Sequence, residues 1–167
     1  MYKGRVYWIT GLSGAGKTTV GSLLFERLRE EKDNVVMLDG DVVRKTFGND
    51  LGYTREDRHE MAMRYSRISL MLSEQGIDVV CCTISMFDDV RAWNRDNIVD
   101  YKEIYLRVSR EVLAQRNQKD LYASSQSELV GFGISMDEPK SPDLVLDNDG
   151  RQSPEEAVGI IWKEMVK

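Results

Sequence analysis

Residues 11–18 read Gly11-Leu12-Ser13-Gly14-Ala15-Gly16-Lys17-Thr18 and directly follow the apolar run Val6–Thr10. They match the phosphate-binding pattern G-x-x-x-x-G-K-S/T, and residues 17–31 continue with helical apolar spacing. Glycines let the backbone curl so that successive N–H groups face one anion, and a helix N-terminus adds its positive dipole end. Strand, loop and helix in this order therefore predict a P-loop that binds nucleotide phosphates.

The loop residues predict contacts with ATP and Mg²⁺. Lys17 would reach the β- and γ-phosphate oxygens, which makes it a candidate catalytic residue, and the Thr18 hydroxyl would be a ligand of Mg²⁺. An accidental glycine-rich turn is the alternative, but four constrained positions between a strand and a helix argue against it. The residues expected to bind the cofactor here are Gly11, Ser13, Gly14, Ala15, Gly16, Lys17, Thr18 and Thr19.

The composition limits the partners of the chain. Its 167 residues suit a single domain, 1–167, and a formal net charge of −5 argues against a dedicated nucleic-acid binder. The sequence has no apolar run of membrane-spanning length and no N-terminal signal segment, so we expect a soluble, cytoplasmic protein with a small-molecule partner. Cys81 and Cys82 are adjacent and lack zinc-ligand spacing, which predicts two reduced strand residues.

Short apolar runs alternate with amphipathic stretches along the chain. The runs are typical of parallel strands buried on both faces: Val6–Thr10, Val35–Leu38, Val79–Thr83, Ile104–Val108 and Leu144–Leu146. Helices are predicted between them over Lys17–Glu31, Thr54 to about Glu74, Asp88–Val99 and Ser109–Gln115, and a last one begins at Ser153-Pro154. This alternation predicts an α/β fold of the P-loop NTPase type, a three-layer α/β/α sandwich with a five-stranded parallel sheet.

Residues 117–142 interrupt the alternation. This stretch is polar, contains serines and glycines, and includes Pro139 and Pro142 near its end. It is long for a loop within one domain, and long loops are commonly functional. We therefore expect a lid segment that covers the bound substrates.

Two aspartates follow the second predicted strand, in Leu38-Asp39-Gly40-Asp41. Ligands of open α/β sheets bind beyond the carboxyl ends of the strands, so Asp39 and Asp41 should face the P-loop. Asp39 is assigned to Mg²⁺, and Asp41 would accept the proton of the attacking hydroxyl. Asp41 is placed on the acceptor side because Arg44 follows three residues later and suits a phosphate. An ordinary Asp-Gly turn is the alternative.

The reaction class is narrowed by what accompanies the P-loop. A GTPase needs an Asn-Lys-x-Asp base reader, and residues 117–120 hold these letters in the wrong order. The small size argues against a motor or a large ATPase. The favoured interpretation is a kinase that transfers the γ-phosphoryl group of ATP to a nucleotide, and the alternative is a non-catalytic nucleotide-binding regulator.

Several strings together resemble the adenylylsulfate (APS) kinase family, whose members phosphorylate the ribose 3′-hydroxyl of adenosine 5′-phosphosulfate. The strings follow the family's order and span most of the chain: residues 11–18, Leu38-Asp39-Gly40-Asp41-Val42-Val43-Arg44, and Asp50-Leu51-Gly52-Tyr53-Thr54-Arg55-Glu56-Asp57-Arg58. Thr83-Ile84-Ser85 resembles the family's Ile-Ser-Pro segment, and residues 116–122 resemble the start of its lid.

The resemblance implies roles on the acceptor side. Asp41 would lie by the 3′-hydroxyl, as base or metal partner, and Asp39 would lie next to it. Arg44 and Arg58 would hold the anionic groups of the acceptor, since a guanidinium suits sulfate or phosphate oxygens. Tyr53 stands where the family has a Phe that stacks on the acceptor base.

The resemblance also implies roles for residues that surround the two aspartates and arginines. Ile84 and Ser85 would line the acceptor pocket, and the family's serine at the Ser85 position has been labelled a phosphoserine intermediate. Direct in-line transfer needs no such intermediate, so a catalytic role of Ser85 is held only as a candidate. Arg116 and Lys119 would approach ATP from the lid side.

The departures from the family pattern cluster on the acceptor side. Met61 replaces an Asn that helps to bind APS, and Met86 replaces a Pro. Leu129 or Phe132 takes the place of a Phe that covers the second face of the adenine. Residues 120–139 contain no Lys or Arg, whereas the family's lid is basic.

Intact ATP-side motifs with altered acceptor-side motifs indicate a changed acceptor. Ile84-Ser85-Met86-Phe87, with Trp93-Asn94-Arg95 downstream, also resembles a capsule-biosynthesis branch that phosphorylates the 3′-hydroxyl of cytidine diphosphoramidate. APS is the expected acceptor and cytidine diphosphoramidate is the alternative. The resemblance further suggests a homodimer.

Overall fold

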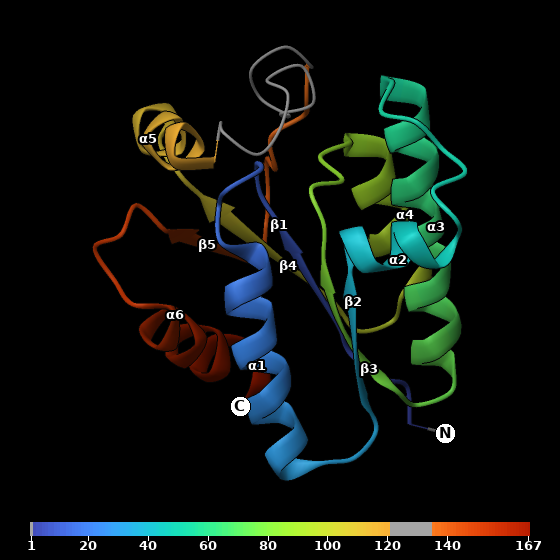
Figure 1. Ribbon diagram of the computed structural model, residues 1–167. Helices are drawn as coiled ribbons and strands as arrows, with labels where there is room; N and C mark the ends of the chain where they lie inside the picture. The colour runs from blue at the N-terminus through green and yellow to red at the C-terminus, as the bar shows by residue number, and fades with distance from the viewer. Residues whose placement is uncertain (1, 121–134) are drawn as a thin grey trace.

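The computed structural model describes residues 2–120 and 135–167 and arranges them around a parallel sheet with helices on both faces (Figure 1). The spatial order of the five strands is β2-β3-β1-β4-β5. Their bounds are β1 Val6–Thr10, β2 Val35–Asp39, β3 Asp78–Cys82, β4 Tyr101–Arg107 and β5 Leu144–Asp147. The predicted three-layer α/β/α architecture with a five-stranded parallel sheet is confirmed.

Helices connect successive strands and cover the two faces of the sheet. Their bounds are α1 Lys17–Glu31, α2 Gly40–Thr46, α3 Arg55–Glu74, α4 Asp88–Asn97, α5 Arg110–Asp120 and α6 Pro154–Ile161, and the last continues as a π-helical turn over Trp162–Val166. α1 and α6 pack on one face, whereas α2, α3 and α4 pack on the other (Figure 1).

Strand β1 shows why the sheet is buried on both sides. All five of its residues are buried, and successive side chains point to opposite faces. Tyr7 and Ile9 belong to the core cluster under α1 and α6, whereas Val6 and Trp8 belong to the cluster under α3 and α4. A continuous apolar run in the sequence is therefore what a central parallel strand requires.

The predicted helix starts are confirmed by their caps. The Thr54 hydroxyl accepts a hydrogen bond from the Asp57 N–H at 3.1 Å. At the start of α6, Ser153 and Glu156 form a reciprocal capping box, in which each side chain accepts from the other residue's N–H. Both arrangements satisfy N–H groups that have no partner within the helix.

Several element boundaries differ from the prediction. Helix α2 was not predicted, because Asp39-Gly40 has the sequence of a turn, whereas here Asp39 is the N-cap of a short helix. Strand β4 begins at Tyr101, three residues earlier than predicted, where it pairs with Val6. Helix α5 continues past Gln115 to Asp120, since neither glycine nor proline stops it there. Helix α4 ends at Asn97 because Ile98 is extended.

The segment predicted as a lid is only partly described. Residues 117–120 belong to α5, and residues 135–142 form neither helix nor strand. A lid over residues 117–142 stays a prediction. Within the described ranges, no helix combines the length and apolarity needed to cross a bilayer.

Candidate active site

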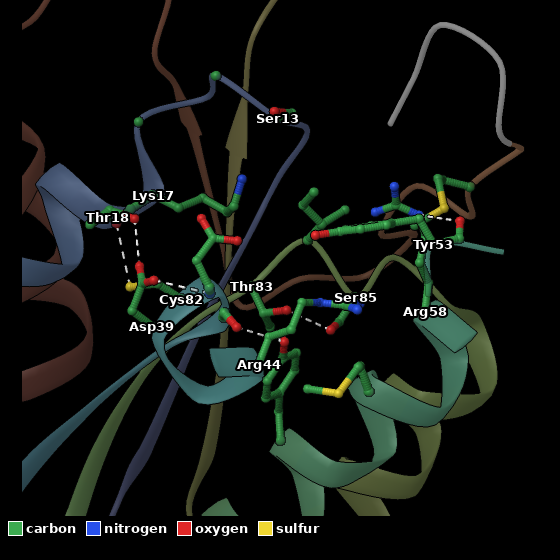
Figure 2. Close-up of a pocket in the computed structure, with 18 of the residues that line it drawn as sticks. Ser13, Lys17, Thr18, Asp39, Arg44, Tyr53, Arg58, Cys82, Thr83 and Ser85 are labelled. Atoms are coloured by element: carbon green, nitrogen blue, oxygen red, sulfur yellow. Dashed lines mark hydrogen bonds between the residues drawn. The ribbon is translucent and has the colours of Figure 1, made fainter. Parts of the chain in front are cut away.

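A pocket of about 320 Å³ lies at the carboxyl ends of β1, β2 and β3 (Figure 2). Parallel pairing places Ile9, Asp39 and Cys82 side by side at this edge, so the segments that follow the three strands meet there. The structure brings the following predicted residues into the pocket wall: Ser13, Gly14, Gly16, Lys17, Thr18, Thr19, Asp39, Asp41, Arg44, Tyr53, Arg58, Ile84 and Ser85.

The P-loop has the backbone conformation of an anion-binding nest. Gly14 and Gly16 have φ values of 83° and 92°, in the left-handed region that favours glycine, and the buried Ala15 lies between them. Gly11 lies outside the pocket wall because its Cα packs against the Leu106 carbonyl, where a Cβ would approach to 2.6 Å. Gly11 and Ala15 therefore support the loop from the side that faces away from the pocket.

Lys17 extends from the first turn of α1 back along the loop. Its Nζ donates a hydrogen bond to the Leu12 carbonyl at 2.8 Å. Burial lowers the pKa of Lys17 to about 8, although the nearby carboxylates of Asp41 and Asp39 act in the opposite direction. A bound phosphate chain would supply close negative charge to this half-buried ammonium group.

Thr18 and Asp39 link the P-loop to the end of β2. The Thr18 hydroxyl donates to Asp39 Oδ2 at 2.7 Å, and Asp39 Oδ1 accepts from the N–H groups of Asp41 and Val42 at 3.1 and 3.3 Å. A hydroxyl and a carboxylate suit Mg²⁺, which prefers oxygen ligands. No cluster of three or more metal-ligating side chains occurs in the described part of the chain.

Tyr53 lies between two arginines on the side of the pocket that is predicted to bind the acceptor. The guanidinium carbon of Arg44 is 4.5 Å from the ring centroid and that of Arg58 is 5.1 Å away, and Figure 2 shows the ring edge-on between them. Arg44 is buried and donates to the carbonyls of Leu51 and Gly52 at 2.7 and 2.8 Å. Arg44 therefore also fixes the turn that carries Tyr53, a task that the sequence did not indicate.

The segment after β3, residues 83–85, forms another part of the pocket wall. Ser85 is buried, has a φ of 33°, and its hydroxyl shares a hydrogen bond of 2.7 Å with the Thr83 hydroxyl. The Ile84 carbonyl accepts a hydrogen bond from the Thr10 hydroxyl. A left-handed backbone at a residue other than glycine costs energy and is characteristic of functional sites. The group that shares a hydrogen bond with the Ser85 hydroxyl is thus another hydroxyl and not a general base.

The floor of the acceptor side is apolar. Met61 and Phe87 are each 1% exposed, and Met136 joins them in the pocket wall. The Tyr65 hydroxyl donates to the Gly40 carbonyl at 2.9 Å, and burial raises the pKa of Tyr65 to about 12. Tyr65 therefore stays protonated and contributes no negative charge to the pocket.

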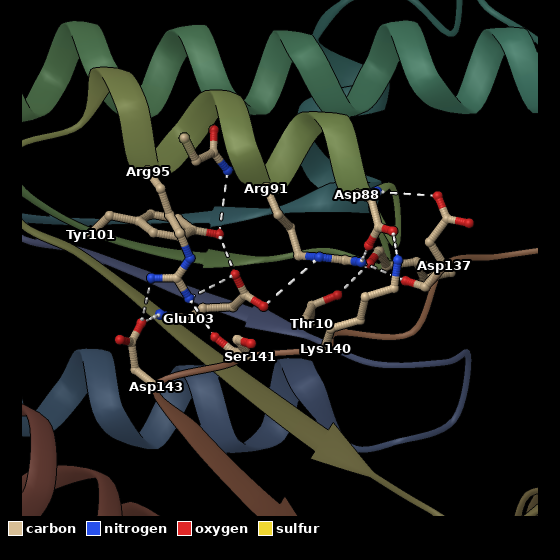
Figure 3. A network of polar contacts seen from close by, with 12 residues as sticks. Thr10, Asp88, Arg91, Arg95, Tyr101, Glu103, Asp137, Lys140, Ser141 and Asp143 are labelled. Atoms are coloured by element: carbon tan, nitrogen blue, oxygen red, sulfur yellow. Dashed lines mark hydrogen bonds and ion pairs between the residues drawn. The ribbon is translucent and has the colours of Figure 1, made fainter.

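Asp137 anchors the chain next to Met136 (Figure 3). Its N–H donates to the Met86 carbonyl at 2.9 Å, its carboxylate accepts from the Asp88 N–H at 3.1 Å, and its carbonyl accepts from Arg91 at 2.7 Å. Arg91 in turn pairs with Glu103 at 3.8 Å, where burial raises the pKa of Glu103. One polar network thus ties α4 and β4 to the segment that carries Met136 into the pocket wall.

Asn148 contacts the P-loop from outside and was missed by the sequence analysis. Its Nδ2 donates to the Ala15 carbonyl at 2.7 Å, and Arg116 donates to the carbonyls of Gly14 and Asn148 at 2.9 and 2.6 Å. The signal that could have found Asn148 is its place directly after β5, because the carboxyl end of any strand in a parallel sheet lies at the ligand edge.

Three predicted site residues are not placed. The side chain of Lys119 and the whole of Leu129 and Phe132 lie outside the described residues. Arg116, which was expected to approach ATP, is observed against the P-loop backbone. The roles of the residues in the pocket stay predictions, because geometry alone does not test them.

Comparisons with known proteins show which family the chain resembles. The sequence profile of adenylylsulphate kinase matches residues 3–147. The chain is 38% identical over 164 residues to a cytidine diphosphoramidate kinase from Campylobacter jejuni, covering 96% of this chain and 95% of that protein. It is 39% identical over 163 residues to an adenylyl-sulfate kinase from Halothermothrix orenii, covering 95% and 88%.

Solved structures extend the likeness to three dimensions. The Mycobacterium tuberculosis APS kinase in complex with AMPPNP and APS superposes with a TM-score of 0.88 at 29% identity, with all of both chains covered. A gluconokinase from Sinorhizobium meliloti has a TM-score of 0.72 at 18% identity, which shows a shared fold alone.

Proposed function

The chain belongs to the adenylylsulphate kinase family, and from this premise we propose that it transfers the γ-phosphoryl group of ATP to the ribose 3′-hydroxyl of adenosine 5′-phosphosulfate. The observation that carries the proposal is the hydrogen bond of 2.7 Å between Thr18 and Asp39. It joins the phosphate-binding loop to the end of the neighbouring strand, with Lys17 and Asp41 in the same pocket wall.

The residues divide the work between the two substrates. The N–H groups of the P-loop and the Lys17 ammonium would hold the β- and γ-phosphates and stabilise the charge that develops during transfer. Mg²⁺, when bound, would neutralise phosphate charge, held by the Thr18 hydroxyl with Asp39 close by. Asp41 is exposed in the first turn of α2 and would accept the proton of the attacking 3′-hydroxyl.

A second acceptor is supported by the apolar floor. The buried Met61 stands where an APS-binding Asn is expected, and losing a hydrogen-bond partner typically costs about 1–3 kcal/mol. The similarity to the cytidine diphosphoramidate kinase covers nearly the whole of both chains. Cytidine diphosphoramidate is therefore the second candidate acceptor, with the same 3′-hydroxyl chemistry.

An acceptor panel tests both candidates. The protein is incubated with ATP, Mg²⁺ and either APS or cytidine diphosphoramidate, and ADP and phosphorylated product are quantified, with Lys17→Ala as the inactive control. Turnover of APS supports the main proposal, and turnover of the cytidine compound alone replaces it by the second candidate. Tight ATP binding without product from either acceptor would indicate a regulator.

Two further proposals concern the protein in the cell. We propose that it acts in the cytoplasm, where ATP is supplied, and that it forms a homodimer, as the family resemblance suggests. Light scattering of the purified protein measures its mass directly, and a value near 19.2 kDa would exclude the dimer.

A further inference from the structure

The two carbonyl groups at the tip of the P-loop are held by donors from outside the loop. Arg116 on α5 donates to the Gly14 carbonyl at 2.9 Å, and Asn148 donates to the Ala15 carbonyl at 2.7 Å. Asn148 itself is 8% exposed. A buried side-chain amide on a backbone carbonyl fixes the orientation of one peptide unit.

Asn148 is itself fixed through its main chain. Its N–H donates to the Arg107 carbonyl at 2.8 Å, and its carbonyl accepts from Arg116 at 2.6 Å. The side-chain amide therefore extends from a main chain that is bonded on both sides. It also packs directly on Gly16, where an added Cβ would come within 2.7 Å of Nδ2.

The peptide held by Asn148 is one that faces the phosphate site. The carbonyl and the N–H of a trans peptide point in opposite directions, so fixing the Ala15 carbonyl outward aims the Gly16 N–H inward. Gly16 lines the pocket, and Lys17 and Thr18 follow it. The preceding peptide has a different task, because the Ala15 N–H closes the loop onto the Leu12 carbonyl at 3.1 Å.

We propose that Asn148 is a positioning residue for phosphate binding, whose side-chain amide holds the Ala15–Gly16 peptide so that the Gly16 N–H faces the phosphate chain of ATP. This deepens the proposed function, since it rests on the P-loop binding a nucleotide phosphate chain. Preformed N–H donors bind an anion without reorganising first, so losing the amide weakens phosphate binding.

Calorimetry with Mg²⁺ and inorganic tripolyphosphate measures phosphate binding by the P-loop alone, without contributions from the nucleobase of ATP or from the acceptor. Asn148→Ala raises the Kd for tripolyphosphate about tenfold, the effect of roughly one buried hydrogen bond. Gln152→Ala is the matched control, because Gln152 lies in the same turn and donates its amide to the Asp147 carbonyl at 3.2 Å. The control binds tripolyphosphate like the wild type, and an equal loss in both variants would overturn the proposal.

Steady-state kinetics adds a readout that a purely structural role would not move. Asn148→Ala raises the KM for ATP by about the same factor and leaves the KM for the acceptor unchanged, whereas Asn148→Ser, which keeps a shorter donor, recovers part of the loss. Equal rises in both KM values would contradict a role confined to the phosphate chain. If the affinity for tripolyphosphate depended on Asn148 but the protein phosphorylated neither acceptor, this proposal would be supported and the proposed function would be overturned.

A measurement on the wild type covers the case in which the alanine variant does not fold. The side-chain amide protons of Asn148 exchange slowly with solvent in the NMR spectrum before any ligand is added, because their acceptor is already in place. Exchange as fast as in a denatured chain would show that the bond is not preformed and would overturn the proposal.

Discussion

The ammonium group of Lys17 lies against the Leu12 carbonyl, and burial lowers its pKa to about 8. A phosphate chain favours the charged form, so the pKa rises on binding and the complex takes up a proton near pH 8. We predict that ATP affinity is full well below pH 8 and weakens as the pH rises through 8, by up to about tenfold per unit. Calorimetry in two buffers of different ionisation enthalpy measures the uptake. Proton uptake should be absent in Lys17→Ala and kept in the control Lys45→Ala, which removes an exposed lysine of α2. Uptake in both variants would show that another group takes up the proton.

Arg58 gives a second prediction at the scale of single residues. Its guanidinium lies over Tyr53 and its Nε donates to the Tyr53 carbonyl at 3.0 Å, on the acceptor side of the pocket. Arg58→Ala should raise the acceptor KM at least about tenfold, as expected for a charged hydrogen bond, and change the ATP KM little. The control is Arg67→Ala, an exposed arginine of the same helix. A larger effect on ATP would contradict the assignment of Arg58 to the acceptor side.

A site residue can be predicted from the sequence when a motif or a strand end determines its position. Lys17 and Thr18 follow from the spacing of the loop, and Asp39 follows from the end of β2. The place of Asn148 at the ligand edge follows from the predicted strand β5, but its contact with the Ala15 carbonyl could not be predicted, because that contact depends on which strand lies beside β4 and on the turn after β5. The second task of Arg44 was equally hidden, since carbonyl partners leave no pattern in a sequence.

At the scale of elements, Asp39 combines two tasks that a pair of substitutions can separate. It is the N-cap of α2 and the hydrogen-bond acceptor of Thr18. Asparagine is as good an N-cap as aspartate, whereas alanine costs about 1 kcal/mol. We predict that Asp39→Asn keeps the free energy of unfolding but weakens Mg²⁺ activation about 10–100-fold, the usual loss for a residue that supports a metal. Urea denaturation and Mg²⁺ titration of turnover measure the two effects, and a strongly destabilised Asp39→Asn would refute the separation.

The bounds of the longer elements were predicted more accurately than those of the short ones. Long periodic segments such as α1 and α3, and the buried strand β1, were located within a residue or so of their observed ends. Helix α2 has only seven residues, too few to be stable alone, and it depends on its cap and on the burial of Val43 and Arg44. Such helices carry almost no periodicity that a sequence analysis can detect.

At the scale of the whole molecule, the network in Figure 3 connects stability to the acceptor pocket. The side chains of Arg91 and Glu103 are 6% and 3% exposed, and Glu103 also pairs with Arg95 at 3.2 Å, so it keeps one cation when Arg91 is removed. Arg91→Ala should lower the free energy of unfolding by about 1.5–3 kcal/mol, the usual value for hydrogen bonds of a charged group, and raise the acceptor KM, since Asp137 loses a donor. Arg107→Ala, which breaks an exposed pair with Asp147, should have little effect on either. Similar unfolding midpoints for the two variants would refute a stabilising role of the network.

The strand order has a consequence for how new specificities arise. Among the described residues and apart from Met136, the side of the pocket predicted for the acceptor comes from one uninterrupted stretch, from Gly40 after β2 to Phe87 before α4. The P-loop and the residues that hold it are drawn from residues 11–19, 116 and 148. Two crossovers in a gene, one on either side of that stretch, would therefore transfer these acceptor-side residues to a related kinase. The residues with which that kinase binds the ATP phosphates would stay unchanged. In this fold, a new acceptor specificity can thus be acquired by recombination of one gene segment, and not only by successive point mutations.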